Sequence, residues 1–146
     1  MGHDIGPVSP GPELDAVILR VLQGMRRIAV VGISDNPERA SHGIARFLAG
    51  QGFEVVGVNP VLDAFPGVKI YPSLADIPGT VDVVDVFRRS DAVPGIVDAA
   101  IARGDGAVWL QEGVSHPEAE DRARAAGLDV VADRCIYKDW LRLMNA

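Results

Sequence analysis

The sequence predicts an α/β domain with a doubly wound, five-stranded parallel sheet. Short runs rich in valine recur along its 146 residues, and they are hydrophobic almost throughout, as parallel strands are when helices cover both faces of their sheet. Segments with apolar residues at helical spacing separate these runs. Alternating strands and helices with short connections form right-handed crossovers within one sheet, and we expect the strand order 3-2-1-4-5.

The first half of the chain contributes two helices and two strands to this prediction. Pro12 suits a first helical turn, and Gly24 closes the apolar periodicity that follows it. The run 28–32 is expected to be the first strand, and the helical pattern behind it ends at Gly50. The run 54–58 then forms the second strand.

The second half repeats the alternation after a connection over 61–80 that is expected to be mostly irregular, with one helical turn near 73–76. It is expected to hold strands at 82–87, 107–111 and 129–133, a helix from Ser90 or Asp91 to Gly104, a helix from the capping box Ser115–Glu118 to Gly127, and a last helix over about 136–144. Residues 1–11 are rich in glycine and proline and are expected to form a flexible lead-in to one domain of residues 12–146.

Composition and charge narrow the range of possible functions. The net charge is −6 at pH 7, so no general basic field attracts nucleic acid or an anionic membrane. Cys135 is the single cysteine, which excludes an intramolecular disulfide and fits a reducing compartment. The sequence has no apolar run of membrane-spanning length and no signal-peptide pattern. We therefore expect a cytoplasmic protein without nucleic-acid or membrane partners.

In a doubly wound sheet, ligands bind outside the carboxyl ends of the strands, where the strand order reverses. The first strand ends at Gly32, and the polar loop behind it leads into a helix whose N-terminal N–H groups favour an anion. The second strand ends in Asn59-Pro60, where dinucleotide-binding folds usually place an acid for the ribose hydroxyls. The sequence therefore favours a phosphate-bearing nucleotide other than NAD.

Several loop residues have both a binding and a structural interpretation. Arg39 is either a phosphate ligand or a solvated charge, and Ser41 a helix cap, a phosphate ligand or both. Pro60, with Asn59, either forms a wall against an adenine or simply ends its strand. Two adjacent arginines at 88–89 either face a phosphate or form surface ion pairs, with Asp85 or Asp91.

The loops after the expected strands 107–111 and 129–133 offer polar groups, but these groups do not form a recognisable catalytic set. Gln111 supplies a donor and an acceptor, and Gly113 permits a close approach of the backbone. Trp109 is expected in the core, and Cys135 is expected to be buried and inert, because no histidine has a fixed place beside it. No group of residues has the spacing of metal ligands, and we expect neither a catalytic site nor a metal site.

Six motifs occur in order along the chain. They are Val-Gly-Ile-Ser-Asp-Asn-Pro-Glu-Arg at 31–39, Val-Asn-Pro at 58–60, Tyr-Pro-Ser-Leu at 71–74, Asp-Val-Val-Asp-Val-Phe-Arg at 82–88, Val-Trp-Leu-Gln-Glu-Gly-Val at 108–114 and Val-Val-Ala-Asp-Arg-Cys at 130–135. Together they resemble the small stand-alone CoA-binding proteins of bacteria and archaea, a family similar to the N-terminal CoA-binding domain of the succinyl-CoA synthetase alpha subunit. The resemblance covers about residues 12–144.

The resemblance implies a Rossmann-like fold that binds coenzyme A or an acyl-CoA. By motif, the implied binding residues are Gly32, Ile33, Ser34, Asp35, Arg39, Ser41, Asn59, Pro60, Phe87, Arg88, Gln111, Glu112 and Gly113. Those before residue 42 would meet the CoA phosphates, those at 59–60 would flank the nucleotide, and those at 87–88 would line the cleft. Those at 111–113 would lie toward the pantetheine arm. Glu112 stands where the stand-alone family usually has a hydrophobic residue, and it looks more like the Thr-Glu-Gly of the synthetase.

We expect a carrier, a sensor or a partner of an acyl-CoA enzyme, and a homodimer is compatible with this. A CoA ligase would need a phosphorylatable histidine on a second domain and an ATP-binding partner domain, so ligase activity is not expected of these 146 residues. Two alternatives stay open, because doubly wound domains have many functions. One is an NAD(P)-dependent oxidoreductase, and the other is a ligand-free protein-interaction module.

Overall fold

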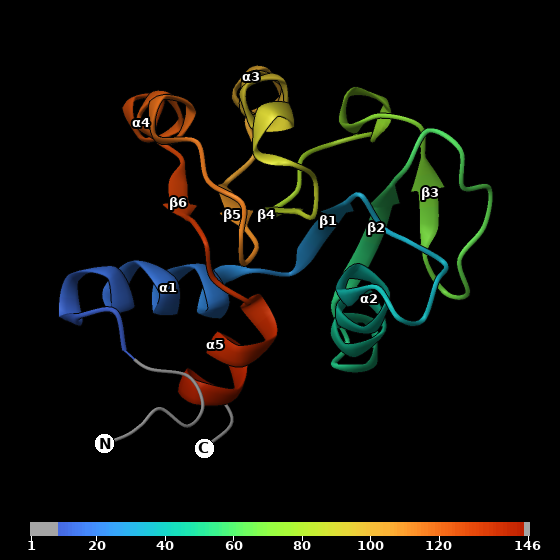
Figure 1. Cartoon of the computed structure of the whole chain (residues 1–146), viewed down its shortest axis with the longest axis horizontal. Coiled ribbons are helices and arrows are strands. Elements are labelled where there is room, and N and C mark those ends of the chain that lie inside the picture. Colours follow the sequence, from blue (N-terminus) through green and yellow to red (C-terminus); the bar gives the residue numbers. More distant parts are fainter. Residues whose placement is uncertain (1–8, 145–146) are drawn as a thin grey trace.

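Six parallel strands form one sheet in the order β3-β2-β1-β4-β5-β6 (Figure 1). The computed structural model describes residues 9–144 of the chain. The strands are β1 Arg27–Val31, β2 Glu54–Val58, β3 Lys69–Tyr71, β4 Val83–Val86, β5 Ala107–Leu110 and β6 Asp129–Val131. The chain winds outward from β1 in two directions, which confirms the predicted Rossmann-like α/β class. Most of the expected lead-in, residues 1–8, lies outside the described residues.

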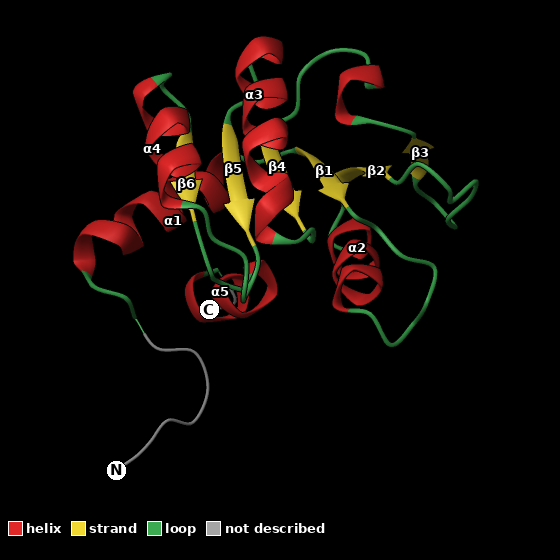
Figure 2. Cartoon of the chain, turned by 45° about the horizontal axis from the view of Figure 1, so that its top comes forward, coloured by secondary structure: helices red, strands yellow, loops and turns green. Residues whose placement is uncertain are grey.

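Helices cover both faces of the sheet (Figure 2). They are α1 Pro12–Gly24, α2 Ala40–Gly50, α3 Val93–Arg103, α4 Pro117–Ala125 and α5 Ile136–Leu143, with short 3-10 turns at Leu74–Asp76 and Ser90–Ala92. α3 and α4 pack on one face, and α1, α2 and α5 pack on the other. Trp109 is fully buried as expected, and its indole N–H donates to the carbonyl of Arg134 (2.8 Å).

The structure corrects the number of strands and the position of the third predicted one. The predicted order places 82–87 at the sheet edge beside 54–58, whereas β4 pairs with β1 at the centre. The edge belongs to β3, which lies within the connection expected to be irregular and pairs with β2. All three residues of β3 are at least partly exposed, so this strand leaves no hydrophobic run in the sequence. The helical turn expected near 73–76 is confirmed.

Two predicted helix caps are wrong. Ser41 lies inside the first turn of α2, where it is buried and no side chain caps the helix. α4 is capped by His116 instead of Ser115, because the His116 ring nitrogen Nδ1 accepts from the N–H of Ala119. The carboxylate of Glu120 in turn accepts from the N–H of His116 (2.7 Å). The reciprocal cap therefore exists with other partners than the sequence indicates.

Paired charges fasten the last helix to the first. Arg142 of α5 donates two hydrogen bonds to the carboxylate of Asp15 in α1, at 2.7 and 3.0 Å. This guanidinium holds the pKa of Asp15 below its ordinary value. Asp139, itself buried, accepts hydrogen bonds from both Arg142 and Arg134. α1 and α5 are therefore joined directly.

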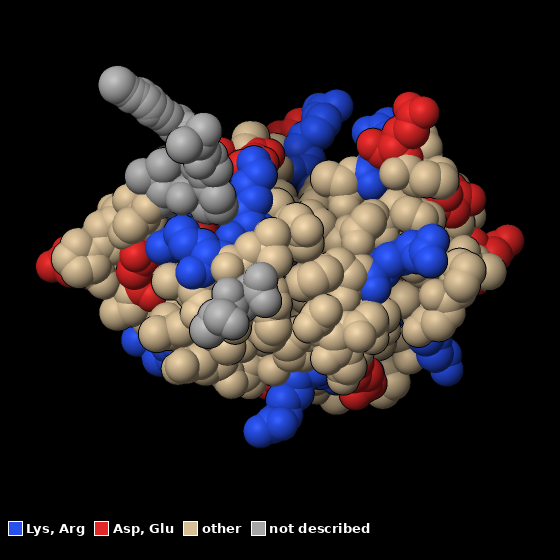
Figure 3. Space-filling model, turned by 90° about the horizontal axis from the view of Figure 1, so that it is seen from below, with Lys and Arg blue, Asp and Glu red and all other residues tan. Residues whose placement is uncertain are grey.

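The surface shows no single field of charge on the face drawn in Figure 3. Positive and negative side chains are scattered around a broad uncharged area there, in keeping with the acidic net charge of −6. Among the helices within residues 9–144, none combines the length and the apolar character that crossing a membrane requires.

Gly32 allows β1 and β4 to approach each other at their carboxyl ends. Its φ of +88° lies in the left-handed region, which favours glycine. A Cβ at this position would lie 2.8 Å from the carbonyl oxygen of Phe87, the residue that follows β4. The N–H of Phe87 also donates to the carbonyl of Val31 (2.8 Å), so the two backbones are tied together at this point.

Gly32→Ala is expected to destabilise the domain strongly. The new methyl group would meet backbone atoms, which cannot move aside as a flexible side chain can, and the left-handed φ adds strain. We expect the free energy of unfolding to fall by about 2 kcal/mol or more, measured by urea denaturation. Gly43→Ala is the matched control, because Gly43 lies in α2 with open space around it. There alanine should raise the free energy of unfolding by about 0.5–1 kcal/mol, and equal stability of the two variants would contradict the prediction.

Candidate functional site

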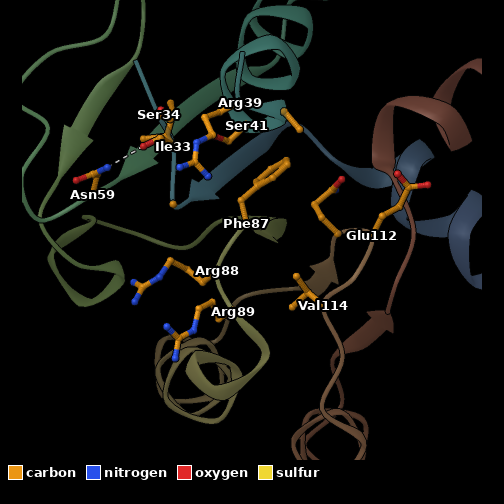
Figure 4. Close-up of a pocket in the computed structure, with 13 residues that line it drawn as sticks. Ile33, Ser34, Arg39, Ser41, Asn59, Phe87, Arg88, Arg89, Glu112 and Val114 are labelled. Atoms are coloured by element: carbon orange, nitrogen blue, oxygen red, sulfur yellow. Dashed lines mark hydrogen bonds between the residues drawn. The ribbon is translucent and has the colours of Figure 1, made fainter. Parts of the chain in front are cut away.

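An open crevice of about 540 Å³ lies at the carboxyl ends of β1 and β4, where the strand order reverses (Figure 4). Its walls come from the loops behind β1, β2, β4 and β5 and from the start of α2. The lining residues are Gly32, Ile33, Ser34, Arg39, Ala40, Ser41, Asn59, Phe87, Arg88, Arg89, Gln111, Glu112 and Val114. The crevice therefore occupies the place where doubly wound sheets bind ligands.

A second hollow, of about 370 Å³, shares Arg88 with the crevice. Its other lining residues are mostly apolar or small. They include Val31, Val58, Pro60, Pro72, Leu74, Ala92, Ile96 and Ala99. Arg88 therefore stands where a polar crevice and an apolar hollow meet.

Two arginines of the crevice have no acidic partner. The guanidinium groups of Arg39 and Arg88 form no ion pair or hydrogen bond with any side chain within residues 9–144, and both residues are exposed. Arg89 differs, because it forms an ion pair with Asp91 (2.6 Å). Arg39 and Arg88 come from different loops and approach the crevice from different sides (Figure 4). The crevice thus offers two free positive charges to an anion.

Asn59 fixes the loops instead of presenting its amide to the crevice. Its Nδ2 donates to the carbonyl of Ile33 (2.8 Å, dashed in Figure 4), which joins the end of β2 to the loop behind β1. Its Oδ1 accepts from the N–H groups of Val61 and Leu62. Both polar atoms of this side chain are therefore used within the protein.

The structure brings most of the predicted binding residues together. All except Asp35, Pro60 and Gly113 line the crevice, and Pro60 lines the second hollow. Asp35 and Gly113 line neither. The N–H of Gly113, in the turn behind β5, donates instead to the carboxylate of Asp133 in the loop behind β6 (2.7 Å). Ala40 and Val114 also line the crevice although their sequence context gives no sign of it.

Asp85 is the most unusual polar residue near the crevice. It belongs to β4 and is fully buried, so of the two possible partners for a surface ion pair with an arginine, Asp85 forms none and Asp91 pairs with Arg89. Its Oδ1 accepts a hydrogen bond from Nε2 of Gln111 (2.6 Å), and its Oδ2 has no partner within the described part of the chain. Burial raises the pKa of this carboxyl group to about 8, against the smaller opposing effect of the Gln111 hydrogen bond. Asp85 is therefore mostly protonated at neutral pH.

The far wall of the crevice leads toward α5. Glu112 is exposed and forms an ion pair with Lys138 of α5 (2.9 Å). Cys135, just before α5, is half-buried, and this burial raises the pKa of its thiol. A raised pKa supports the inert interpretation of this cysteine. Among residues 9–144, no three histidine, cysteine or acidic side chains are arranged to hold a metal ion.

Comparison with known proteins shows which family the chain resembles. The family model described as a CoA binding domain matches residues 26–140. The uncharacterized protein YneT of Bacillus subtilis is 40% identical over 121 residues, which are 83% of this chain and 90% of that protein. The solved structure of a hypothetical protein from Pyrococcus horikoshii OT3 has a TM-score of 0.85 at 34% identity, covering 98% of this chain and 99% of that one.

A larger enzyme contains a similar unit. The dinucleotide forming acetyl-coenzyme A synthetase 1 of Ca. Korarchaeum cryptofilum matches with a TM-score of 0.69 at 30% identity. The match covers 79% of this chain and 28% of that one. The likeness therefore concerns one part of the synthetase chain.

Asp85 is expected to make stability depend on pH. Its pKa is about 8 in the folded chain against 3.8 ordinarily, so the folded state keeps a proton that the unfolded state releases between these values. The free energy of unfolding should therefore fall as pH rises from about 5 to 8, by at most about 1.4 kcal/mol per pH unit from this group, and the fall should end above that range.

Urea denaturation at several pH values measures this effect against Asp85→Asn. The stability of this variant relative to the wild type should grow as pH rises, because asparagine has no proton to lose. Asp63→Asn, which changes an exposed acid, is the control. A difference between Asp85→Asn and wild type that stays constant across the range would show that Asp85 does not titrate there.

Proposed function

Because the chain belongs to the CoA-binding domain family, we propose that the crevice at the carboxyl edge of its sheet binds coenzyme A or an acyl-CoA. The observation that carries this proposal is the pair of free arginines, Arg39 and Arg88, on separate loops around one crevice. CoA carries a diphosphate and a separate 3′-phosphate. Two unpaired guanidinium groups match two separate phosphate groups, because each can donate paired hydrogen bonds to phosphate oxygens.

The start of α2 offers further hydrogen-bond donors to the phosphate end of the ligand. No side chain caps this helix, so the first backbone N–H groups remain available to an anion. Ala40 and Ser41 of this first turn line the crevice beside Arg39. We assign the diphosphate to this region and the 3′-phosphate to the neighbourhood of Arg88.

The apolar hollow beyond Arg88 suits the adenine ring. Pro60 and Leu74 offer flat or apolar surface there, next to a cation that can hold the ribose phosphate. The pantetheine arm then extends in the other direction, past Phe87 toward Gln111. This assignment uses both hollows for one elongated ligand.

We propose a carrier, a sensor or a partner of an acyl-CoA enzyme as the role of this binding. The likeness to the acetyl-coenzyme A synthetase covers 28% of that chain, so it supports CoA binding here and lends no support to the whole ligase reaction. Asn59 has both polar atoms engaged in the loops and carries no carboxylate that could accept from the ribose hydroxyls of NAD. The oxidoreductase alternative therefore gains no support.

The protein is expected to bind CoA more tightly than dephospho-CoA and not to bind NAD measurably. Calorimetric titration of the purified protein with the three ligands in parallel measures this, after any bound nucleotide has been removed and identified by mass. CoA at 100 times its Kd should also raise the free energy of unfolding by about 2.7 kcal/mol. A clear NAD signal without CoA binding would overturn the proposed function.

Arg39→Ala and Arg88→Ala should each weaken CoA binding at least several-fold, because each removes a charge-assisted phosphate contact. The loss should shrink as salt concentration rises, since the contact is electrostatic. Arg46→Ala is the matched control: it removes an exposed arginine from α2 outside the crevice. An unchanged CoA affinity in Arg39→Ala would remove that residue from the site.

A further inference from the structure

We propose that Asp85 is a positioning residue that turns the amide of Gln111 so that its carbonyl oxygen accepts a hydrogen bond from the pantetheine arm of CoA. This inference rests on the proposed function and adds one specific contact to it. It concerns the end of the crevice away from the phosphates.

Asp85 is not explained by packing. It stands among valines in a central strand, and its neighbours in register are Val30 of β1 and Trp109 of β5. Taking a carboxyl group out of water is costly unless its oxygens gain partners. Asp85 gains one, the amide of Gln111, and its second oxygen has none within residues 9–144. A valine would fill this position at a lower free-energy cost. We therefore attribute the presence of an acid here to its hydrogen bond with Gln111.

The hydrogen bond decides which end of the Gln111 amide faces the crevice. Nε2 donates to Oδ1 of Asp85, so the proton that Asp85 keeps at neutral pH lies on Oδ2, and Oε1 of Gln111 points away from the acid. Oε1 has no hydrogen-bond partner in the described chain, and the Gln111 side chain is largely buried, with 5% of the residue exposed. Gln111 lines the crevice. Its carbonyl oxygen is therefore presented to the ligand.

A carbonyl oxygen at this point selects a donor. Phosphate oxygens are acceptors and would be repelled, whereas the pantetheine arm carries two amide N–H groups, a hydroxyl and a thiol. The placement agrees with this chemistry: Glu112, the next residue along the chain, lies across Phe87 from Arg88 (Figure 4).

Asp85→Val and Gln111→Met test the inference by calorimetric titration with two probes. One probe is CoA, and the other is adenosine 3′,5′-bisphosphate, which has the 3′-phosphate but no pantetheine arm. Both variants should bind CoA about three- to tenfold more weakly, the worth of one hydrogen bond, and bind the bisphosphate as the wild type does. The double variant should be no weaker than either single variant, because both act through one oxygen.

Val84→Ala is the matched control. Val84 precedes Asp85 in β4, but its side chain packs on the opposite face of the sheet, so shortening it loosens the strand without reaching Gln111. Its affinity for CoA should equal that of the wild type. If Asp85→Val does not fold, Gln111→Met with the two probes decides the question.

Three results would overturn the inference while the proposed function stands. They are unchanged CoA affinity in Asp85→Val or Gln111→Met, equal losses for both probes, and single losses that add in the double variant. Absence of CoA binding by the wild type would instead overturn the proposed function, and the inference with it.

Discussion

The rest of the structure depends on the close approach of β1 and β4 at the centre of the sheet. The two strands end at the same edge, and the chain then turns toward α2 on one face and toward α3 on the other. This divergence opens the crevice, and Gly32 keeps it narrow by bringing no side chain against Phe87. Wider spacing at this point would move apart the loops that carry Arg39 and Arg88, and with them the two charges that a single ligand can span.

Much of the fold could be predicted because burial on both faces of a sheet leaves a strong hydrophobic signal. β3 could not, since an edge strand of three partly exposed residues carries no such signal. Because β3 cannot be recognised in the sequence, the predicted order places the strand at 82–87 at the sheet edge that β3 occupies. The cap at His116 was hidden for another reason: Ser115 beside it is the stronger cap by propensity, and an imidazole accepts a hydrogen bond only in one tautomer.

The site could be predicted as a set of loops, and less well as a set of side chains. The rule that ligands bind at carboxyl ends of strands selects loops without structural detail. Gln111 follows from this rule, whereas Glu112 follows from the family resemblance. Asp35 does not line the crevice, because the conformation of the turn behind β1 determines which of the turn's residues face the crevice. Asp85 counts as one of two possible ion-pair partners in the sequence, because acids close to arginines in sequence often pair with them. Its place inside a valine run of a central strand was the available sign that it is buried.

The bond between Asp15 and Arg142 also determines how this unit can be joined to others. It brings the first and last helices together, and neither helix lines the crevice. A polypeptide can therefore enter and leave the unit at one corner, and a linker on either side need not cross the ligand's path. The architecture is suited to modular use within a longer chain, since neither end of the described residues contributes to the binding edge.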